Sequence, residues 1–559
     1  MANFLLPILS SAARRTKANF LQKIRQTSAV QEQFLLSLLR THQDTELGQK
    51  YGLKEIKTID RFREQIPILP YSSYEPYLER IARGESNILT PDPVIYLNLT
   101  SGSTGKQKLI PVTKRSRNAL NRANQTSMGF VAEAAKQRNL PIGKMLLTSS
   151  VQLLGHTSSG IPYGPVSAST LRLSNLLYRQ IFTHPYEALQ PTDSLARHYV
   201  CLLFALRNPN LAIIGANFPV LALRLCDYLE SYADDLIRDV ETGEIAPWLN
   251  LEPAMRAKLE RQWSAYPKRA AQLREILKHE GRLTPKLAWP QLSFIVTARG
   301  GTSNFYLERF PNYFGNTPTF GGIYASSEAT FGVYHAFDQD DTILAIESGF
   351  FEFIPPDQWE VDQPKTLLPH EVKVGEYYRI LVTNYSGFYR YDIGDVVEVV
   401  GFYEQAPLIT FRHRMGGLLS STTEKTTEFH ATQVMQRLQQ EFGLPLENFC
   451  ITLSEHEVPA HYLVNIELPS GHALGDPQAF LSRFDRLLKD IHGSYEQKRG
   501  DQVPPPRLRI LASGSFAIVR QRLLQKGIPD SQLKFPHISE DRQFLAGLQV
   551  KQEVRLPED

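Results

Sequence analysis

The chain has 559 residues, of which 42% are hydrophobic and 21% charged, and its 61 lysines and arginines nearly balance its 58 aspartates and glutamates. This composition excludes a mainly disordered chain. The net charge of +3 argues against nucleic acid or a membrane surface as a partner. Small molecules are therefore the expected ligands. Because the length exceeds what one hydrophobic core usually organises, we expect a large domain and a smaller second domain.

The spacing of the cysteines and the apolar N-terminal run predict the cellular compartment. Cys201, Cys226 and Cys450 lie far apart without a CxxC pair, so neither a disulfide framework nor a zinc site is indicated. The apolar run at residues 1–9 precedes its basic residues and is too short to span a bilayer. We therefore expect a cytoplasmic protein with no signal peptide and no transmembrane helix.

The first hundred residues are predicted to be helical and then extended. Apolar residues recur at helical spacing over 17–53, which indicates an amphipathic helical region. Prolines at 67 and 70 favour an extended segment over 66–71, because each disfavours the helical conformation in the residue before it. A helix is expected to resume over 74–81.

An apolar run at Leu97–Leu99 then breaks into a loop that is suited to binding phosphate. Its glycines let the backbone approach an anion, its hydroxyl residues offer donors, and a lysine can balance the charge. The loop residues are Ser101, Gly102, Ser103, Thr104, Gly105 and Lys106. The spacing is not that of a Walker A motif. A flexible polar turn is an equally good interpretation of the loop alone.

The middle of the chain alternates short apolar runs with longer helical stretches. The runs at 145–147, 211–214, 292–297 and 380–383 resemble strands, and 194–206 resembles a helix. This alternation favours an α/β fold.

Three polar segments follow, and each has a simpler alternative interpretation. Glu328 could hold a metal ion or a nucleotide edge, although Ser326 alone predicts a helix N-cap. Asp395 could accept hydrogen bonds from two ribose hydroxyls, although an acid-glycine-acid run also suits a turn. The segment Glu424–Glu428 is most simply a charged helix start.

The strongest candidate boundary is Arg414-Met415-Gly416-Gly417, where two glycines loosen the backbone. We predict a first domain over 1–414, a hinge over 415–419 and a second domain over 420–559. The second domain is expected to be a compact α+β unit. Its predicted helices are 429–442, 477–491 and 516–525, and its predicted strands are 449–453, 462–468 and 508–511.

In this order the segments resemble the signatures of the adenylate-forming enzymes, which form a superfamily with acyl-CoA synthetases, adenylation domains and luciferase. Within it, the chain is more similar to the auxin-responsive GH3 acyl-acid amido synthetases, from about Lys17 to its end. The phrases that carry this resemblance are Tyr324-Ala325-Ser326-Ser327-Glu328 with Phe331-Gly332, Phe351-Glu352-Phe353, Gly387-Phe388-Tyr389-Arg390-Tyr391 leading to Gly394-Asp395-Val396, Gly401-Phe402 with Ala406-Pro407, and Lys534-Phe535-Pro536.

The resemblance implies an α/β fold with a large, multi-subdomain N-terminal adenylation domain and a smaller mobile α+β C-terminal domain. It also implies roles for individual residues. The implied catalytic residues are Lys534, Glu328 and Arg414, and Glu328 is also implied to bind Mg²⁺. The nucleotide contacts implied are Ser101 to Lys106, Tyr324, Ala325, Ser326, Ser327, Glu328, Asp395, Arg414 and Lys534. The amine side is implied to be Arg507, Leu508, Arg509, Ile510 and Leu511. Without the resemblance, Lys534 would be a surface lysine.

The sequence departs from the family pattern at two places in the hinge region. Met415-Gly416-Gly417 replaces a more polar run, and Glu424 stands where the family often has Asp. The stretch 157–170, which is expected to help form the acyl pocket, is also particular to this chain.

The predicted function is that of a ligase that forms an amide bond. It adenylates a small carboxylic acid with ATP and Mg²⁺, transfers the acyl group to an amine such as an amino acid, and releases AMP and pyrophosphate. The expected partners are these small substrates, and a monomer is expected. The alternatives are an acyl-CoA synthetase-like ligase with CoA as acceptor, a non-catalytic nucleotide-binding protein of the same fold, and a kinase-like enzyme that yields ADP.

Overall fold

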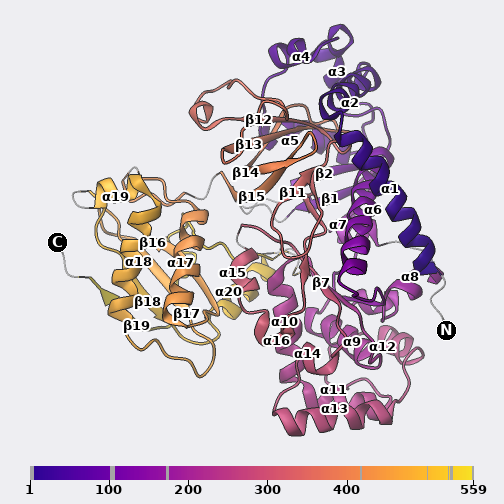
Figure 1. Cartoon of the computed structure of the whole chain (residues 1–559), viewed down its shortest axis with the longest axis vertical. Helices are drawn as coiled ribbons and strands as arrows, with labels where there is room; N and C mark the ends of the chain where they lie inside the picture. Colours follow the sequence, from indigo (N-terminus) through magenta and orange to yellow (C-terminus); the bar gives the residue numbers. More distant parts are fainter. Residues whose placement is uncertain are drawn as a thin grey trace. The chain divides into compact units, whose positions relative to one another are not determined.

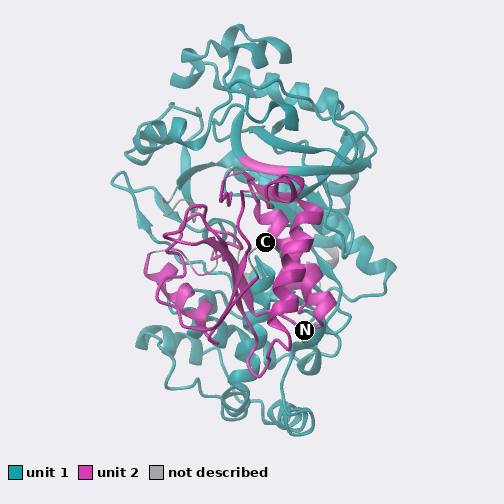
Figure 2. Cartoon of the chain, turned by 90° about the vertical axis from the view of Figure 1, so that its left-hand side faces the viewer, with its two compact units in different colours: residues 1–303, 310–393, 397–411 teal, residues 304–309, 394–396, 412–559 magenta. Residues whose placement is uncertain are grey.

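The computed structural model describes residues 5–100, 108–171, 175–301, 303–415, 418–422, 424–499, 502–526, 528, 530 and 533–556. The chain divides into two compact units (Figure 2). Unit 1 comprises residues 1–303, 310–393 and 397–411, and unit 2 comprises 304–309, 394–396 and 412–559. Strand β14, Tyr391–Tyr403, therefore starts and ends in unit 1 and contributes three residues to unit 2.

A seven-stranded sheet forms the centre of the main hydrophobic core of unit 1. Its strands, in spatial order, are β12 (Phe350–Ile354), β13 (Tyr377–Thr383), β14, β15 (Ala406–Arg414), β11 (Thr342–Leu344), β10 (Thr330–Tyr334) and β9 (Ile323–Ala325). Every residue of β10 and β12 is buried. These strands are therefore covered on both faces, which explains their continuous aromatic and aliphatic sequences.

Two smaller sheets complete the strands of unit 1. One runs β2 (Lys108–Thr113), β1 (Val94–Thr100), β5 (Pro162–Gly164) and β4 (Gly155–His156). The other runs β3 (Met145–Leu147), β6 (Ile213–Gly215), β7 (Phe294–Val296) and β8 (Thr319–Phe320), with every pair parallel. The carboxyl ends of these four strands meet at one edge, which is where open α/β sheets bind their ligands.

The helices of unit 1 are α1 (Leu5–Ile24), α2 (Thr27–His42), α3 (Glu46–Lys50), α4 (Ile59–Gln65), α5 (Tyr71–Ala82), α6 (Lys114–Gln137), α7 (Val166–Thr170), α8 (Asn175–Ile181), α9 (Ser194–Leu206), α10 (Pro219–Ser231), α11 (Ala233–Thr242), α12 (Pro253–Glu260), α13 (Pro267–Glu280), α14 (Pro285–Ala288) and α16 (Pro311–Phe314). Helices α1 and α6 lie side by side (Figure 1). Their contact needs Gly129, because a Cβ there would lie 2.6 Å from the carbonyl oxygen of Ala13. None of the helices in the described part of the chain combines the length and the apolar character that a membrane crossing requires.

Unit 2 is built on a four-stranded sheet in the order β16 (Asn448–Leu453), β17 (Tyr462–Glu467), β18 (Arg507–Leu511) and β19 (Val550–Arg555). Its helices are α15 (Ser303–Leu307), most of which belongs to this unit, α17 (Glu428–Phe442), α18 (Pro477–Ile491), α19 (Gly493–Arg499) and α20 (Ser515–Gln525). Thr427 and His430 form a capping box at the start of α17, and Gly443 follows its end with φ +59°. These local signals set the bounds of the helix.

The predicted α/β class is confirmed, and most predicted elements exist. The helix predicted over 429–442 is α17, the one over 477–491 is α18, and the strand over 145–147 is β3. The region 17–53, predicted only as helical, contains the last eight residues of α1 and all of α2 and α3, whereas the first twelve residues of α1 were not predicted. Helix α19 and strand β19 were missed, since both are short and polar. The three cysteines are free and buried.

Candidate active site

Glu328 lies in a tight turn between β9 and β10, in unit 1. The hydroxyl oxygen of Ser326 accepts hydrogen bonds from the backbone N–H groups of Glu328, at 3.1 Å, and Ala329, at 3.2 Å. Ser326 N–H in turn donates to the carbonyl oxygen of Ala329. The interpretation of Ser326 as a helix N-cap is wrong, because the same hydroxyl geometry closes a turn that leads into strand β10.

The Glu328 side chain is buried, with 8% of the residue exposed. The hydroxyl of Tyr391 donates to its Oε1 at 3.3 Å, and the side-chain amide of Asn384 donates to its backbone carbonyl at 2.9 Å. Burial raises the pKa of Tyr71 to about 12, and the charges of Glu75 and Glu328 contribute to the increase. Glu328 is thus a fixed carboxylate in a largely dry, aromatic setting.

The strands that flank the predicted phosphate loop lie beside this turn. Asn98, on β1, donates from its side-chain amide to the carbonyl oxygen of Ser327 at 3.4 Å. The antiparallel pairing of β1 and β2 runs up to Thr100 opposite Lys108, and the Lys108 ammonium lies 4.9 Å from the centre of the Tyr71 ring. The loop residues Ser101, Gly102, Ser103, Thr104, Gly105 and Lys106 themselves lie outside the described residues.

Tyr324 and Ala325 form the last part of β9, before the turn. The Tyr324 ring stacks on Phe331 with centroids 5.0 Å apart and planes at 29°, and Phe411 lies 5.6 Å away. Ser327 and Tyr324 are only half buried, and Ala325 is exposed. The aromatic contacts fix one ring while leaving this edge of the sheet accessible to a flat ligand.

The carboxyl edge of the parallel sheet carries polar groups that the sequence interpretation missed. Ser149, which follows β3, donates to the side-chain oxygen of Asn217, which follows β6, at 3.2 Å. Thr297 follows β7, and its buried hydroxyl has no hydrogen-bond partner among the described residues. The sequence contains a signal for these groups, because polar residues follow these apolar runs within three positions and parallel strands align their carboxyl ends.

Asp395 and Arg414 form an ion pair in unit 2. Arg414 Nε lies 2.6 Å from Asp395 Oδ1, and the two residues come from β14 and the end of β15. Asp395 is buried, whereas 41% of the Arg414 side chain is exposed. Gly394 has φ +78°, and its carbonyl accepts from Met415 N–H at 2.5 Å. The interpretation of this segment as a turn is wrong, because residues 391–403 form one strand.

Lys534 shares this charged cluster with Asp395, Arg414 and Glu428. Part of the Lys534 residue is exposed, yet desolvation of its ammonium lowers its pKa, and the Arg414 guanidinium lowers it further against the opposing charges of Glu428 and Asp395. Glu428, the first residue of α17, accepts a hydrogen bond from His537 N–H at 2.7 Å. Burial raises the pKa of Glu428, and Lys534 counteracts this. The sequence interpretation treated Glu428 only as a helix start.

The segment predicted to face the amine is strand β18, between β17 and β19 in the sheet of unit 2. Leu508, Ile510 and Leu511 are buried in the unit. Arg507 pairs with Glu457 through two contacts, at 2.7 and 3.0 Å, and Arg509 Nε lies 2.8 Å from a Glu553 oxygen. The apolar residues of the segment support the fold, and its two arginine side chains each pair with a glutamate of the same unit.

The donor set suits a hard cation held chiefly by a phosphate ligand. Among the described residues, no group of three or more His, Cys, Asp or Glu could hold a metal ion by itself. Mg²⁺ is usually bound by one or two carboxylates together with substrate phosphates and water. A single buried carboxylate, Glu328, beside the strands that lead to a Ser, Thr and Gly loop meets this requirement.

Solved structures define the class of this fold. The chain matches two structures of GH3.15 acyl acid amido synthetase, one in complex with 2,4-DB, each with a TM-score of 0.84 and 22% identity; the first covers 96% of both chains and the second 97% of both. It also matches 2-hydroxyisobutyryl-CoA ligase in the postadenylation state, with a TM-score of 0.55, 12% identity, and coverage of 92% of this chain and 90% of that one. The chain therefore shares the fold of GH3.15 acyl acid amido synthetase and of 2-hydroxyisobutyryl-CoA ligase.

Sequence comparison identifies the family. The GH3 family N-terminal, central and C-terminal domains match residues 16–319, 342–414 and 429–543. A relative from Oryza sativa subsp. japonica, "Probable indole-3-acetic acid-amido synthetase GH3.11", is 30% identical over 559 aligned positions, which cover 93% of each chain. The chain belongs to the GH3 family, as its sequence motifs predict.

Proposed function

We propose that this protein is an acyl-acid amido synthetase, which uses ATP to join a small carboxylic acid to the amine of an amino acid. The observation that carries the proposal is the cluster of Asp395, Arg414 and Lys534 in unit 2. These are three charged residues that family resemblance independently assigns to the nucleotide. The family match along most of the chain and the names of its relatives support the same reaction.

The first step activates the acid. An oxygen of the substrate carboxylate attacks the α-phosphorus of ATP, the bond from that phosphorus to the bridging oxygen breaks, and pyrophosphate leaves. Glu328 would hold Mg²⁺, which supplies charge neutralisation at the phosphates. Asp395 accepts from the ribose hydroxyls, and the Lys534 ammonium offsets negative charge where it develops. The loop from Ser101 to Lys106 contributes further donors to the phosphates.

The second step forms the amide. The amine nitrogen attacks the carbonyl carbon of the acyl-adenylate, the bond from carbon to the phosphate oxygen breaks, and AMP leaves with that oxygen. The amine loses one proton in the process. Arg507 and Arg509 supply positive charge toward the carboxylate of an amino acid. Rotation of the predicted second domain, 420–559, about the hinge predicted over 415–419 would separate this step from the first.

We also propose a cytoplasmic monomer with no nucleic-acid or membrane partner. The near-neutral net charge supports the absence of an extended basic surface. Free, buried cysteines suit a reducing compartment. Size-exclusion chromatography with light scattering tests the monomer, and a species of twice the 63.5 kDa chain mass would contradict it.

Product analysis tests the reaction. Purified protein is incubated with Mg·ATP, a pool of carboxylic acids, a pool of amino acids and CoA, and products are identified by mass spectrometry. The proposal predicts AMP, pyrophosphate and an N-acyl amino acid. Thioesters as the only acyl products would favour a CoA ligase, ADP would indicate a phosphotransferase, and ATP binding without turnover of any acid would indicate a non-catalytic protein.

A further inference from the structure

Tyr391 reaches Glu328 from a rigid position in the core of unit 1. Only 1% of the residue is exposed, and its ring packs against Phe388 and Tyr74 with centroid distances of 4.8 and 5.9 Å. The hydroxyl at the end of this ring donates to Glu328 Oε1 at 3.3 Å. Because these two rings and the burial of Tyr391 hold its ring in place, the hydroxyl donates its hydrogen bond from a fixed point.

The turn before Tyr391 is strained and tightly supported. Arg390 has φ +44°, in a region that non-glycine residues seldom adopt, and Gly387 has φ +88°. A Cβ at Gly387 would lie 2.2 Å from the carbonyl oxygen of Leu89, so this position accepts only glycine. The backbone N–H of Arg390 donates to the hydroxyl of Thr383 at 2.8 Å. Such strain persists only where the surroundings determine the conformation.

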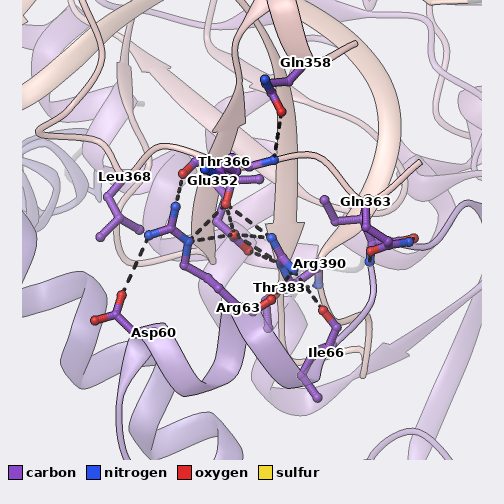
Figure 3. A network of polar contacts seen from close by, with 12 residues as sticks. Asp60, Arg63, Ile66, Glu352, Gln358, Gln363, Thr366, Leu368, Thr383 and Arg390 are labelled. Carbon is purple, nitrogen blue, oxygen red and sulfur yellow. Dashed lines mark hydrogen bonds and ion pairs between the residues drawn. The ribbon is translucent and has the colours of Figure 1, made fainter. Parts of the chain in front are cut away.

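The Arg390 side chain provides that support (Figure 3). Its guanidinium contacts both oxygens of Glu352 at 3.0 to 3.2 Å, and its Nη1 donates to the carbonyl oxygens of Arg63 and Ile66 at 2.7 and 2.9 Å. Thr366 donates to Glu352 at 2.6 Å and also accepts from Arg390. Both charged side chains are almost completely buried, at 5% and 1% exposure. The network fixes the residue immediately before Tyr391.

We infer that Tyr391 is a positioning residue for Glu328, and that the Arg390–Glu352 pair holds the turn from which it acts. This inference rests on the proposed function, because it gives Glu328 a role at the metal and phosphates. A buried carboxylate with one oxygen held by a fixed phenol cannot rotate freely, so its other oxygen faces a constant direction. The Tyr391 hydroxyl lowers the reorganisation needed when a metal and phosphates bind, and its effect appears in metal affinity more than in stability.

The test compares two single-atom deletions in the same aromatic cluster. Tyr391→Phe removes the hydroxyl that contacts Glu328. Tyr74→Phe is the matched control, because its hydroxyl is equally buried but bonds to the backbone of Tyr389. Mn²⁺ binding to the complex with α,β-methylene-ATP is measured by electron paramagnetic resonance, beside thermal unfolding and pyrophosphate exchange. We expect about 10-fold weaker Mn²⁺ binding in Tyr391→Phe and no change beyond twofold in Tyr74→Phe.

Two further variants separate this inference from the proposed function. Replacing Tyr391 by 4-aminophenylalanine returns an N–H donor and is expected to recover most of the lost metal affinity. Glu328→Gln is expected to lose both metal binding and exchange. If Glu328→Gln loses both while Tyr391→Phe binds Mn²⁺ like Tyr74→Phe, the positioning role is wrong and the function stands. If Glu328→Gln retains both, the role of Glu328 itself is wrong.

Discussion

Two arginine–carboxylate pairs lie near the start of β14, and they differ in the exposure of the arginine. Arg390 and Glu352 are both buried, and the guanidinium also binds carbonyl and hydroxyl oxygens. Asp395 is buried as well, but 41% of the Arg414 side chain is exposed. The Arg390–Glu352 pair is shielded from solvent and supports the fold. In the other pair the arginine is partly exposed, so Asp395 can exchange its contact with Arg414 for a contact with a ligand. We therefore expect Arg390–Glu352 to stabilise unit 1 and Asp395–Arg414 to take part in nucleotide binding in unit 2.

The largest expected effect is on stability, from breaking the buried pair. Arg390→Met and Glu352→Leu each leave one charge buried without its partner, which costs about 3–5 kcal/mol in the free energy of unfolding. The double variant should recover much of this loss, because a buried ion pair is often replaceable by apolar side chains. Urea denaturation measures all three proteins. Additive losses in the double variant would show that the two charges do not depend on each other.

The next effect is on catalysis, from removing the Lys534 ammonium. Loss of one fixed charge at a developing negative charge costs about 10²–10³-fold in rate, so Lys534→Ala should lose that much pyrophosphate exchange. Lys526→Ala, which changes an exposed lysine after α20, should exchange normally.

The protonation of Lys534 predicts the direction in which pyrophosphate exchange changes with pH. Desolvation and Arg414 lower the pKa of Lys534, and the proposed role needs the protonated ammonium. Exchange should therefore fall as pH rises, at a pH below the usual lysine range, and Lys534→Arg should move this decline upward. An alkaline decline at the same pH in Lys534→Arg would assign the titration to another group.

A smaller effect is expected on nucleotide affinity. Asp395→Asn removes a charged acceptor for the ribose hydroxyls, and such hydrogen bonds contribute about 1.5–3 kcal/mol, or roughly 10- to 100-fold in affinity. Isothermal titration with α,β-methylene-ATP measures the change. Glu404→Gln, which removes an exposed ion pair with Arg25, is the control and should bind normally. Equal affinities in the two variants would remove Asp395 from the nucleotide site.

The smallest predicted effect concerns the capping box of α17. Burial lowers the pKa of His430 to about 3, whereas an unfolded imidazole titrates near 6.5, so the unfolded chain binds the extra proton between these values. Stability should therefore fall as pH falls from about 6.5. His430→Gln keeps a side-chain acceptor for Thr427 N–H without titrating, and it should be as stable as the native chain at pH 8 but more stable at pH 5. Thermal unfolding at both pH values decides this, and parallel curves would contradict it.

The sequence predicted the elements that local patterns determine. The helix 429–442, the helix 477–491 and the strand 145–147 follow from periodicity and apolar runs, and the family and fold class are confirmed. Pairings between distant residues were not predictable in this way. Arg390–Glu352 and Tyr391–Glu328 join positions 38 and 63 residues apart, and only the packing of β9, β12 and β14 brings them together. The turn at Ser326 was misread because a serine hydroxyl caps a helix and closes a turn with the same hydrogen bonds.

In the proposed reaction, a carboxylic acid is activated by bonding to AMP. A substrate acid labelled with ¹⁸O in both carboxylate oxygens tests it directly, with the released nucleotide analysed by mass spectrometry. The released AMP should carry one ¹⁸O atom, and the amide should retain the other. Unlabelled AMP, or ¹⁸O in inorganic phosphate released beside ADP, would contradict it.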